Sequence, residues 1–332
     1  MSEIRWGLIG ATTIGREWMV EAIREAGGVV SAVMSRDAVR GKAYAAEFGI
    51  PKSTTDLASL WADVDAVYIA TTNERHREEC VAAAEAGKHV LCEKPLATRL
   101  EDARAMVDAC ARSGVVMGVN HHLRNAATHR AVRDAIRSGR IGRPLAARVV
   151  HGGSLPEHLR TWRLQDSSGG GGAIMDLTVH DGDLLRFLLS DEPEAVSALA
   201  QNGGLAAPGV EDAAVIQLRF ASGLIAQLHD SFTTPYLRTT VEVHGTEGSI
   251  AALDCMPQRP GGTVSIRTAS GEEQLKLSHE NYYVRGIRAF HEAIAGRGQP
   301  VCTGEDGVRS LAVALAARRS VTSGRVEAIE PL

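Results

Sequence analysis

Short apolar runs alternate with amphipathic stretches over residues 1–120. Apolar residues spaced three or four positions apart predict helices at residues 15–25, 40–48, 74–86 and 100–113. The intervening runs predict strands at residues 5–10, 29–34, 66–70, 89–92 and 115–119. Strands that alternate with helices in this way predict a doubly wound parallel sheet, because parallel neighbours need a crossover connection. Such sheets bind ligands at the carboxyl ends of their strands.

The pattern changes after a helix predicted at residues 127–138. Alternating apolar and polar positions in "AAVIQLRFASGLIAQLHDSF" (213–232) predict a hairpin that turns at Ser222-Gly223, and residues 239–253 repeat the pattern. Helices are predicted at residues 283–295 and 307–322. We therefore predict an α/β fold with two domains. A dinucleotide-binding Rossmann domain spans residues 1–122, and a substrate-binding α+β domain with a mainly antiparallel open sheet spans residues 123–332.

Composition narrows the class of protein. The chain has 332 residues, 44% of them hydrophobic, which suffices for buried cores in two domains. Its net charge is -4 and its positive residues are dispersed, which argues against a nucleic-acid partner. Five cysteines without a C-x-x-C pair indicate reduced thiols and a cytoplasmic location. Because no apolar run approaches the ~18 residues that span a bilayer, no membrane partner is expected.

The stretch "RWGLIGATTIGREWMVEAI" (5–23) places a strand, a tight turn and a helix in succession. A dinucleotide fingerprint requires this context, with one glycine for the turn and one for the close approach of helix and strand. The free amides at the helix start would face a pyrophosphate. Thr12 stands at the middle glycine position, so an ordinary strand-to-helix turn remains the alternative. The expected cofactor contacts are Gly10, Ala11, Thr12, Thr13, Ile14 and Gly15.

The end of the second predicted strand, "MSRDAVRG" (34–41), bears on coenzyme choice. Sites selective for NAD place an acid there for the ribose diol, whereas sites selective for NADP supply cations for a phosphate. Ser35 and Arg36 occupy the strand end and Arg40 follows one helical turn later, which favours NADPH. Asp37 competes as a diol acceptor, and arginines at a helix start are also common on protein surfaces.

A predicted helix in "GGAIMDLTVHDGDLLRFLL" (171–189) follows the run "SSGGGG" (167–172). Asp176, His180 and Asp183 fall on one stripe of this helix. Histidine exchanges protons near neutrality, and a carboxylate one turn away can orient its ring. A hydrogen-bonded core histidine is the structural alternative. A metal site made from Asp176 and His180 with His121 or His122 is disfavoured, because no clustered ligand spacing supports it; no metal is expected.

Three segments together resemble the glucose-fructose oxidoreductase and inositol dehydrogenase family (Gfo/Idh/MocA). They are "TTNERH" (71–76), "AGKHVLCEKPLA" (86–97) and "GGGAIMDLTVHDGD" (170–183). The lysine motif is specific, and the resemblance covers essentially the whole chain. Two residues depart from the family pattern: Thr72 replaces the usual proline, and Thr178 replaces a glycine.

The resemblance implies roles for individual residues. Lys94 would point toward the nicotinamide and the reacting oxygen, with Glu93 setting its position and Pro95, often cis in this family, fixing the bend. Lys94 and His180 would stabilise and protonate the alkoxide that forms when hydride reaches a ketone. Asp176 would bind substrate hydroxyls or steer His180. Further cofactor contacts are implied for Thr71, Thr72, Asn73 and His76, and substrate contacts for Asn120, Trp162 and Arg163.

Within the family, several segments are most similar to bacterial enzymes that act on 1,5-anhydro-D-fructose. This similarity implies NADPH-dependent reduction of its C2 ketone to 1,5-anhydro-D-mannitol. The alternatives are a sugar or inositol dehydrogenase that works in the oxidative direction and a glycoside hydrolase that uses the nicotinamide transiently. A nucleotide sensor without catalysis is disfavoured by Lys94, Asp176 and His180, since a sensor needs no proton-transfer groups. A homo-oligomer formed through the second sheet is also a hypothesis.

Overall fold

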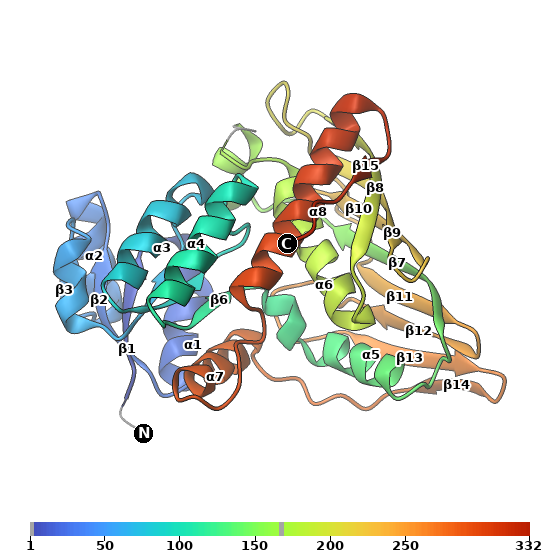
Figure 1. Ribbon diagram of the computed structural model, residues 1–332, viewed down its shortest axis with the longest axis horizontal. Coiled ribbons are helices and arrows are strands. Elements are labelled where there is room, and N and C mark those ends of the chain that lie inside the picture. The colour runs from blue at the N-terminus through green and yellow to red at the C-terminus, as the bar shows by residue number, and fades with distance from the viewer. Residues whose placement is uncertain (1–2, 166–168) are drawn as a thin grey trace. The chain divides into compact units, whose positions relative to one another are not determined.

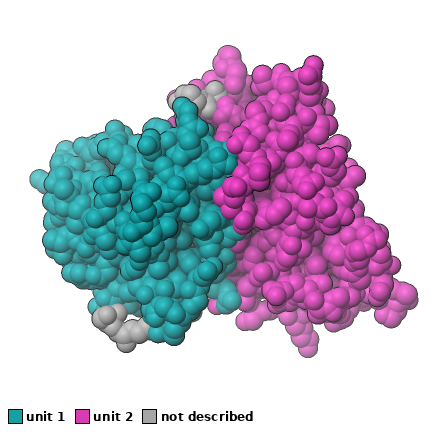
Figure 2. Space-filling model, in the orientation of Figure 1, with its two compact units in different colours: residues 1–122, 281–308 teal, residues 123–280, 309–332 magenta. Residues whose placement is uncertain are grey.

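The computed structural model describes residues 3–165 and 169–332, so the serines of the predicted "SSGGGG" run lie outside the described residues. The chain forms two compact units, made of residues 1–122 with 281–308 and of residues 123–280 with 309–332 (Figure 2). The predicted domain division after residue 122 stays a prediction. The segment 281–308, which that prediction assigned to the second domain, belongs to the first unit.

The first unit is built on a six-stranded parallel sheet in the order β3-β2-β1-β4-β5-β6 (Figure 1). Its strands are β1 (Arg5–Ile9), β2 (Val29–Met34), β3 (Lys52–Thr54), β4 (Ala66–Ile69), β5 (His89–Cys92) and β6 (Met117–Val119). Its helices are α1 (Val20–Glu25), α2 (Ala38–Phe48), α3 (His76–Glu85), α4 (Leu100–Arg112) and α7 (Tyr282–Ile294). The doubly wound parallel sheet is therefore confirmed. Strand β3 was missed because its sequence, KST, contains no apolar residue.

Helix α7 completes the core of the first unit. Tyr283, Ile287 and Phe290 are buried in the same cluster as the side chains of β1 and α1. The Trp6 indole N–H donates to His291 Nε2 over 3.0 Å. The Trp18 and Tyr283 rings stack with centroids 5.5 Å apart. A helix that follows residue 280 thus provides hydrophobic surface that the first 122 residues lack.

The second unit is built on a nine-stranded sheet in the order β14-β13-β12-β11-β7-β10-β9-β8-β15. Its strands are β7 (Pro144–Gly152), β8 (Pro193–Gln201), β9 (Ala213–Phe220), β10 (Ile225–Ser231), β11 (Thr240–Gly245), β12 (Gly248–Leu253), β13 (Thr263–Thr268), β14 (Gly271–Gln274) and β15 (Glu327–Ala328). Among the described strands of this second sheet, only β7 and β10 pair in parallel, so the mainly antiparallel sheet is confirmed.

Helices lie on one side of this sheet (Figure 1). They are α5 (Ala127–Arg137), α6 (Val179–Leu189) and α8 (Gly304–Ser323), whose first turn belongs to the first unit. Strand β9 alternates buried and exposed side chains, as a strand with one covered face must. The predicted hairpin turn is confirmed, and Gly223 has a φ of +88° there. None of the helices in residues 3–165 and 169–332 combines the length and apolar character that a bilayer crossing requires.

Candidate functional site

The turn after β1 has the backbone that a nucleotide turn needs. Gly10 has a φ of +110°, and its N–H donates to the Met34 carbonyl over 2.9 Å. A Cβ on Gly15 would lie 2.7 Å from the Tyr44 hydroxyl oxygen, so only glycine fits this approach. Thr12 uses its hydroxyl to accept a hydrogen bond from the Gly15 N–H over 3.3 Å, which closes the turn without a middle glycine. Ala11, Thr13 and Ile14 are partly or fully exposed around it. Nucleotide contact by residues 10–15 stays a prediction.

The end of β2 presents cations rather than a free acid. Asp37 caps α2, because its Oδ1 accepts from the Val39 N–H over 2.9 Å and from the Arg40 N–H over 3.0 Å. These backbone bonds, that of Arg40 first, lower the pKa of the Asp37 carboxyl. Arg36 and Arg40 are exposed beside it. Ser35 is buried, and its hydroxyl lies in the interior without a hydrogen-bond partner among the described residues. The cofactor contacts predicted for Ser35, Arg36 and Arg40 stay predictions.

Glu93 organises the loop that follows β5. Its carboxylate accepts hydrogen bonds from the Tyr68 hydroxyl, from Asn120 Nδ2 over 2.6 Å and from the Lys94 N–H over 3.3 Å. Burial raises the pKa of the Glu93 carboxyl, while the bonds from Asn120 and Tyr68 oppose the rise. The Lys94-Pro95 peptide is cis. Because the partners come from the ends of three neighbouring strands, the loop that carries Lys94 is fixed at the carboxyl edge of the sheet.

His76 holds two turns of the first unit together. Its ring is fully buried, with Nδ1 3.2 Å from the carbonyls of Pro95 and Leu96 and Nε2 3.2 Å from the Thr71 carbonyl. Burial lowers the pKa of this imidazole. The ribose contact of His76 stays a prediction. Both ring nitrogens lie beside main-chain carbonyl oxygens, and the nitrogen that carries the proton donates to its carbonyl. Asn73 is likewise buried.

The Thr71 hydroxyl donates to Glu79, a buried acid of α3 that also accepts from Arg75 Nε over 2.9 Å. Burial raises the pKa of the Glu79 carboxyl. Thr72, which replaces the usual proline, is partly exposed and donates to Glu74.

In the second unit, Arg163 and Asp176 form an ion pair, while the substrate contacts predicted for both residues stay predictions. Arg163 Nε is 3.3 Å from Asp176 Oδ2, and the Arg163 guanidinium lies over the Trp162 ring at 4.7 Å. Asp176 lies in a short π-helical turn (Ile174–Thr178) that leads into α6, where His180 is buried one turn later. The π-helical turn shifts the predicted stripe locally but keeps both residues in one continuous helical segment.

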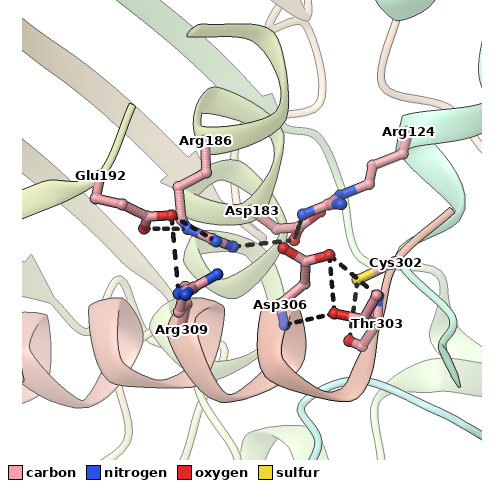
Figure 3. A network of polar contacts seen from close by, with 8 residues as sticks. All are labelled: Arg124, Asp183, Arg186, Glu192, Cys302, Thr303, Asp306 and Arg309. Atoms are coloured by element: carbon pink, nitrogen blue, oxygen red, sulfur yellow. Dashed lines mark hydrogen bonds and ion pairs between the residues drawn. The ribbon is translucent and has the colours of Figure 1, made fainter. Parts of the chain in front are cut away.

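Asp183, the third residue of the predicted stripe, belongs to a structural network (Figure 3). Its two oxygens accept from Nε and a terminal nitrogen of Arg124, each over 2.7 Å, and both side chains are buried. Arg186 bridges from Asp183 to Glu192, which Arg309 also approaches. Sequence reasoning missed this network, because its partners lie on different elements.

Lys94 and Asn120 belong to the first unit, whereas Trp162, Arg163, Asp176 and His180 belong to the second. Each set is placed within its own unit by the contacts above. The convergence of Lys94 and His180 on one substrate atom therefore stays a prediction.

A parallel sheet of this order, with a glycine turn after its first strand, defines a dinucleotide-binding protein. Residues 4–121 match the oxidoreductase family with an NAD-binding Rossmann fold, and residues 129–251 match the Gfo/Idh/MocA C-terminal domain. The chain belongs to the Gfo/Idh/MocA family of oxidoreductases.

Individual relatives cover nearly the whole chain. The 1,5-anhydro-D-fructose reductase of Ensifer adhaerens is 57% identical over 98% of both chains. The inositol 2-dehydrogenase of Rhizobium meliloti is 31% identical over 97% of this chain and 98% of its own. Among solved structures, a levoglucosan dehydrogenase in complex with NADH and levoglucosan is 25% identical, with a TM-score of 0.89 over 99% of this chain and 100% of its own.

Proposed function

We propose that the protein reduces the C2 ketone of 1,5-anhydro-D-fructose with NADPH and forms 1,5-anhydro-D-mannitol. The observation that carries this proposal is the 57% identity to a 1,5-anhydro-D-fructose reductase over 98% of both chains. The 31% identity to an inositol 2-dehydrogenase supports the same class of chemistry, the exchange of hydride between a nicotinamide and a carbon that bears oxygen. Net reduction of a sugar-derived ketone is therefore the activity to test first.

The residues around the first turn fit a dinucleotide. Gly10 supplies the positive φ of the turn and Gly15 the close approach to Tyr44, and Arg36 and Arg40 are exposed at the end of β2. Asp37 is engaged as a helix cap, which leaves its carboxylate less suited to a ribose diol. These features favour the extra phosphate of NADPH. When bound, the coenzyme supplies the hydride for the reduction.

The protein groups would manage the charge that develops on the substrate. A ketone that accepts hydride becomes an alkoxide, which the Lys94 ammonium would stabilise and His180 would protonate. The Glu93 carboxylate would hold the Lys94 main chain in place during this step, since it accepts a hydrogen bond from the Lys94 N–H. Asp176 would orient substrate hydroxyls together with Arg163, 3.3 Å away. Asn120 and Trp162 would border the same sugar.

The test is to measure NADPH and NADH oxidation by absorbance with 1,5-anhydro-D-fructose, other ketoses and dicarbonyls. We expect turnover with the anhydroketose and a preference for NADPH. Lys94→Ala should slow turnover about a hundredfold or more, because loss of one oxyanion donor costs ~2.7 to 4 kcal/mol. Lys88→Ala is the matched control: Lys88 precedes β5 and donates to the Val64 carbonyl, so its loss should leave turnover near the wild-type rate.

Other outcomes would assign another function. Oxidation of an inositol without reduction of any ketose would make the protein a polyol dehydrogenase. Glycoside cleavage without net coenzyme change would make it a hydrolase that uses the nicotinamide transiently. Coenzyme binding without turnover on any polyol or ketose would indicate a sensor.

A homo-oligomer that forms through the nine-stranded sheet is part of the proposal. Support comes from apolar side chains on β8, β9 and β10 that are exposed in the single chain: Leu199 at 79%, Ile225 at 57% and Val215 at 49%. Light scattering of the wild type and of Leu199→Lys tests this. A wild-type monomer at all concentrations would contradict it.

A further inference from the structure

A cluster of buried titratable side chains lies next to His180 in the second unit. His151 on β7 and Asp230 on β10 are opposite each other in the parallel pairing of these strands. Asp181 and Thr178 come from the helical segment that carries His180. Asp181 and Asp230 are fully buried. Buried acids require partners or protons, so the first question is how this cluster holds its charge.

Asp181 and Asp230 are close enough to interact. Two ionised carboxylates repel and cannot hydrogen-bond to each other, so a proton on one of the two acids stabilises the pair. The Thr178 hydroxyl donates to Asp230 Oδ2, while no described group donates to the buried Asp230 Oδ1. Burial first, and Asp181 second, raise the pKa of Asp230 well above its usual range. Because its pKa is raised, Asp230 is the acid that holds the proton, which leaves the negative charge on Asp181.

The Asp181 carboxylate accepts a hydrogen bond from an imidazole. Its Oδ1 lies 2.8 Å from His151 Nδ1, which fixes Nδ1 as the donor and sets the orientation of the ring. The centroids of the His151 and His180 rings are 6.2 Å apart with an angle of 50° between their planes. A series of side-chain contacts thus runs from Thr178 through Asp230 and Asp181 to His151. The ring of His151 lies beside the ring of His180.

Two other titratable groups that interact with this cluster are neutral near pH 7. Burial lowers the pKa of His129 on α5 to about 4, and His151 contributes to that shift. Burial raises the pKa of Cys255, after β12, to about 12, and Asp181 contributes to it. The His151 imidazole, whose Nδ1 lies 2.8 Å from Asp181 Oδ1, is in direct contact with this carboxylate.

We propose that His151 is a positioning residue for His180, held by the Asp181 carboxylate, and that Asp230 serves the cluster as a neutral acid. The inference rests on the proposed function in one respect, that His180 is the proton donor of the reduction. Through Asp181, the cluster would set the ring position and electrostatic environment of that donor. Asp230 would contribute a hydrogen bond and no charge.

Two isosteric substitutions separate the acids. Asp230→Asn keeps a donor toward Asp181 and an acceptor for Thr178, so it mimics the protonated acid. Asp181→Asn removes the one negative charge with little change in shape. In NMR titrations of the imidazole signals without substrate, Asp181→Asn should move the His151 transition to lower pH by about 1 to 3 units, because an opposite charge has been removed. Asp230→Asn should shift it far less.

Kinetics then connects the cluster to His180. Asp181→Asn should lower kcat about tenfold to a hundredfold, with a shifted pH profile and a much smaller change in KM. Asp230→Asn should have the smaller effect. Equal effects of the two substitutions on the His151 titration, or an unchanged pH profile in Asp181→Asn, would overturn the proposal.

A second variant tests the proposal if Asp181→Asn does not fold. His151→Gln keeps a donor for Asp181 but cannot titrate, and an unchanged pH profile of kcat in this variant would also overturn the proposal. The NMR titration needs no substrate, so it tests the cluster even if the wild type proves inactive on 1,5-anhydro-D-fructose. Inactivity of the wild type would refute the proposed function alone.

Discussion

Gly15→Ala should damage the nucleotide turn mainly through its contact with Tyr44, since the next nearest atom, Thr12 Oγ1, would lie 3.3 Å from the new Cβ. A Cβ at this position would lie 2.7 Å from the Tyr44 hydroxyl oxygen, whereas ordinary contacts begin at 3.4 Å, so the two groups must separate by about 0.7 Å. The next atom of the tyrosine, Cζ, lies 3.8 Å away and does not clash. Overpacking of this kind costs about 1 to 3 kcal/mol. If the turn absorbs that cost, NADPH affinity should fall about fivefold to 150-fold.

Tyr44→Phe provides the matched rescue. The Tyr44 hydroxyl is buried without a hydrogen-bond partner among the described residues, so its removal should cost little stability or even increase it. Burial also raises the pKa of this phenol, which keeps it neutral. The double variant Gly15→Ala with Tyr44→Phe removes the clashing oxygen. It should recover most of the lost affinity.

The assay is a fluorescence titration with NADPH, combined with thermal unfolding of each variant. Gly153→Ala serves as the control, because no atom lies within 4 Å of its Cβ position. Wild-type affinity and stability in Gly15→Ala would show that the close approach does not matter. A double variant no better than Gly15→Ala would show that the hydroxyl is not the cause.

Three further predictions address coenzyme choice, proton transfer and stability. Arg40→Ala should weaken NADPH more than NADH in binding titrations; an equal loss for both would remove Arg40 from the phosphate site. His180→Ala should slow steady-state reduction about a hundredfold to ten-thousandfold, and wild-type turnover would exclude it as the proton donor. The burial of His129 lowers its pKa from 6.5 to about 4, so the folded state resists protonation. Its stabilising effect is complete above pH 6.5 and is lost as the pH falls to about 4, at a cost of about 3 kcal/mol. Urea denaturation across this pH range should show the loss, and His129→Gln, which keeps a donor for the Leu123 carbonyl, should flatten it.

The sequence predicted the elements of the first unit well, because helices and strands there alternate with distinct periodicities. Glu93 and Lys94 were also recognisable, since a proline after a strand end marks the loop that bears them. Tyr68 was not predicted as a partner of Glu93, because an aromatic residue inside a buried strand looks like ordinary core. The family resemblance implied a cofactor contact for His76, which stays a prediction. The main-chain carbonyls that lie beside its ring come from separate turns and could not be predicted from the sequence.

Contacts between distant segments explain the rest. The parallel pairing of β7 with β10 brings His151 to Asp230, and no periodicity in either strand specifies that partner. Asp183 shared a helical stripe with His180, yet its carboxylate binds Arg124 from a segment far earlier in the chain. Local patterns establish that a helix has an apolar or polar face. They do not say which element that face will meet.

The return of α7 to the first unit has a consequence for biosynthesis. The chain passes between the two units three times, at residues 122, 280 and 308. A ribosome that has released only the first 122 residues has made all six strands of the parallel sheet, but not the phenylalanine and tyrosine that pack against Trp6 and Trp18. The hydrophobic core of the coenzyme-binding unit therefore stays incomplete until most of the second unit has been translated.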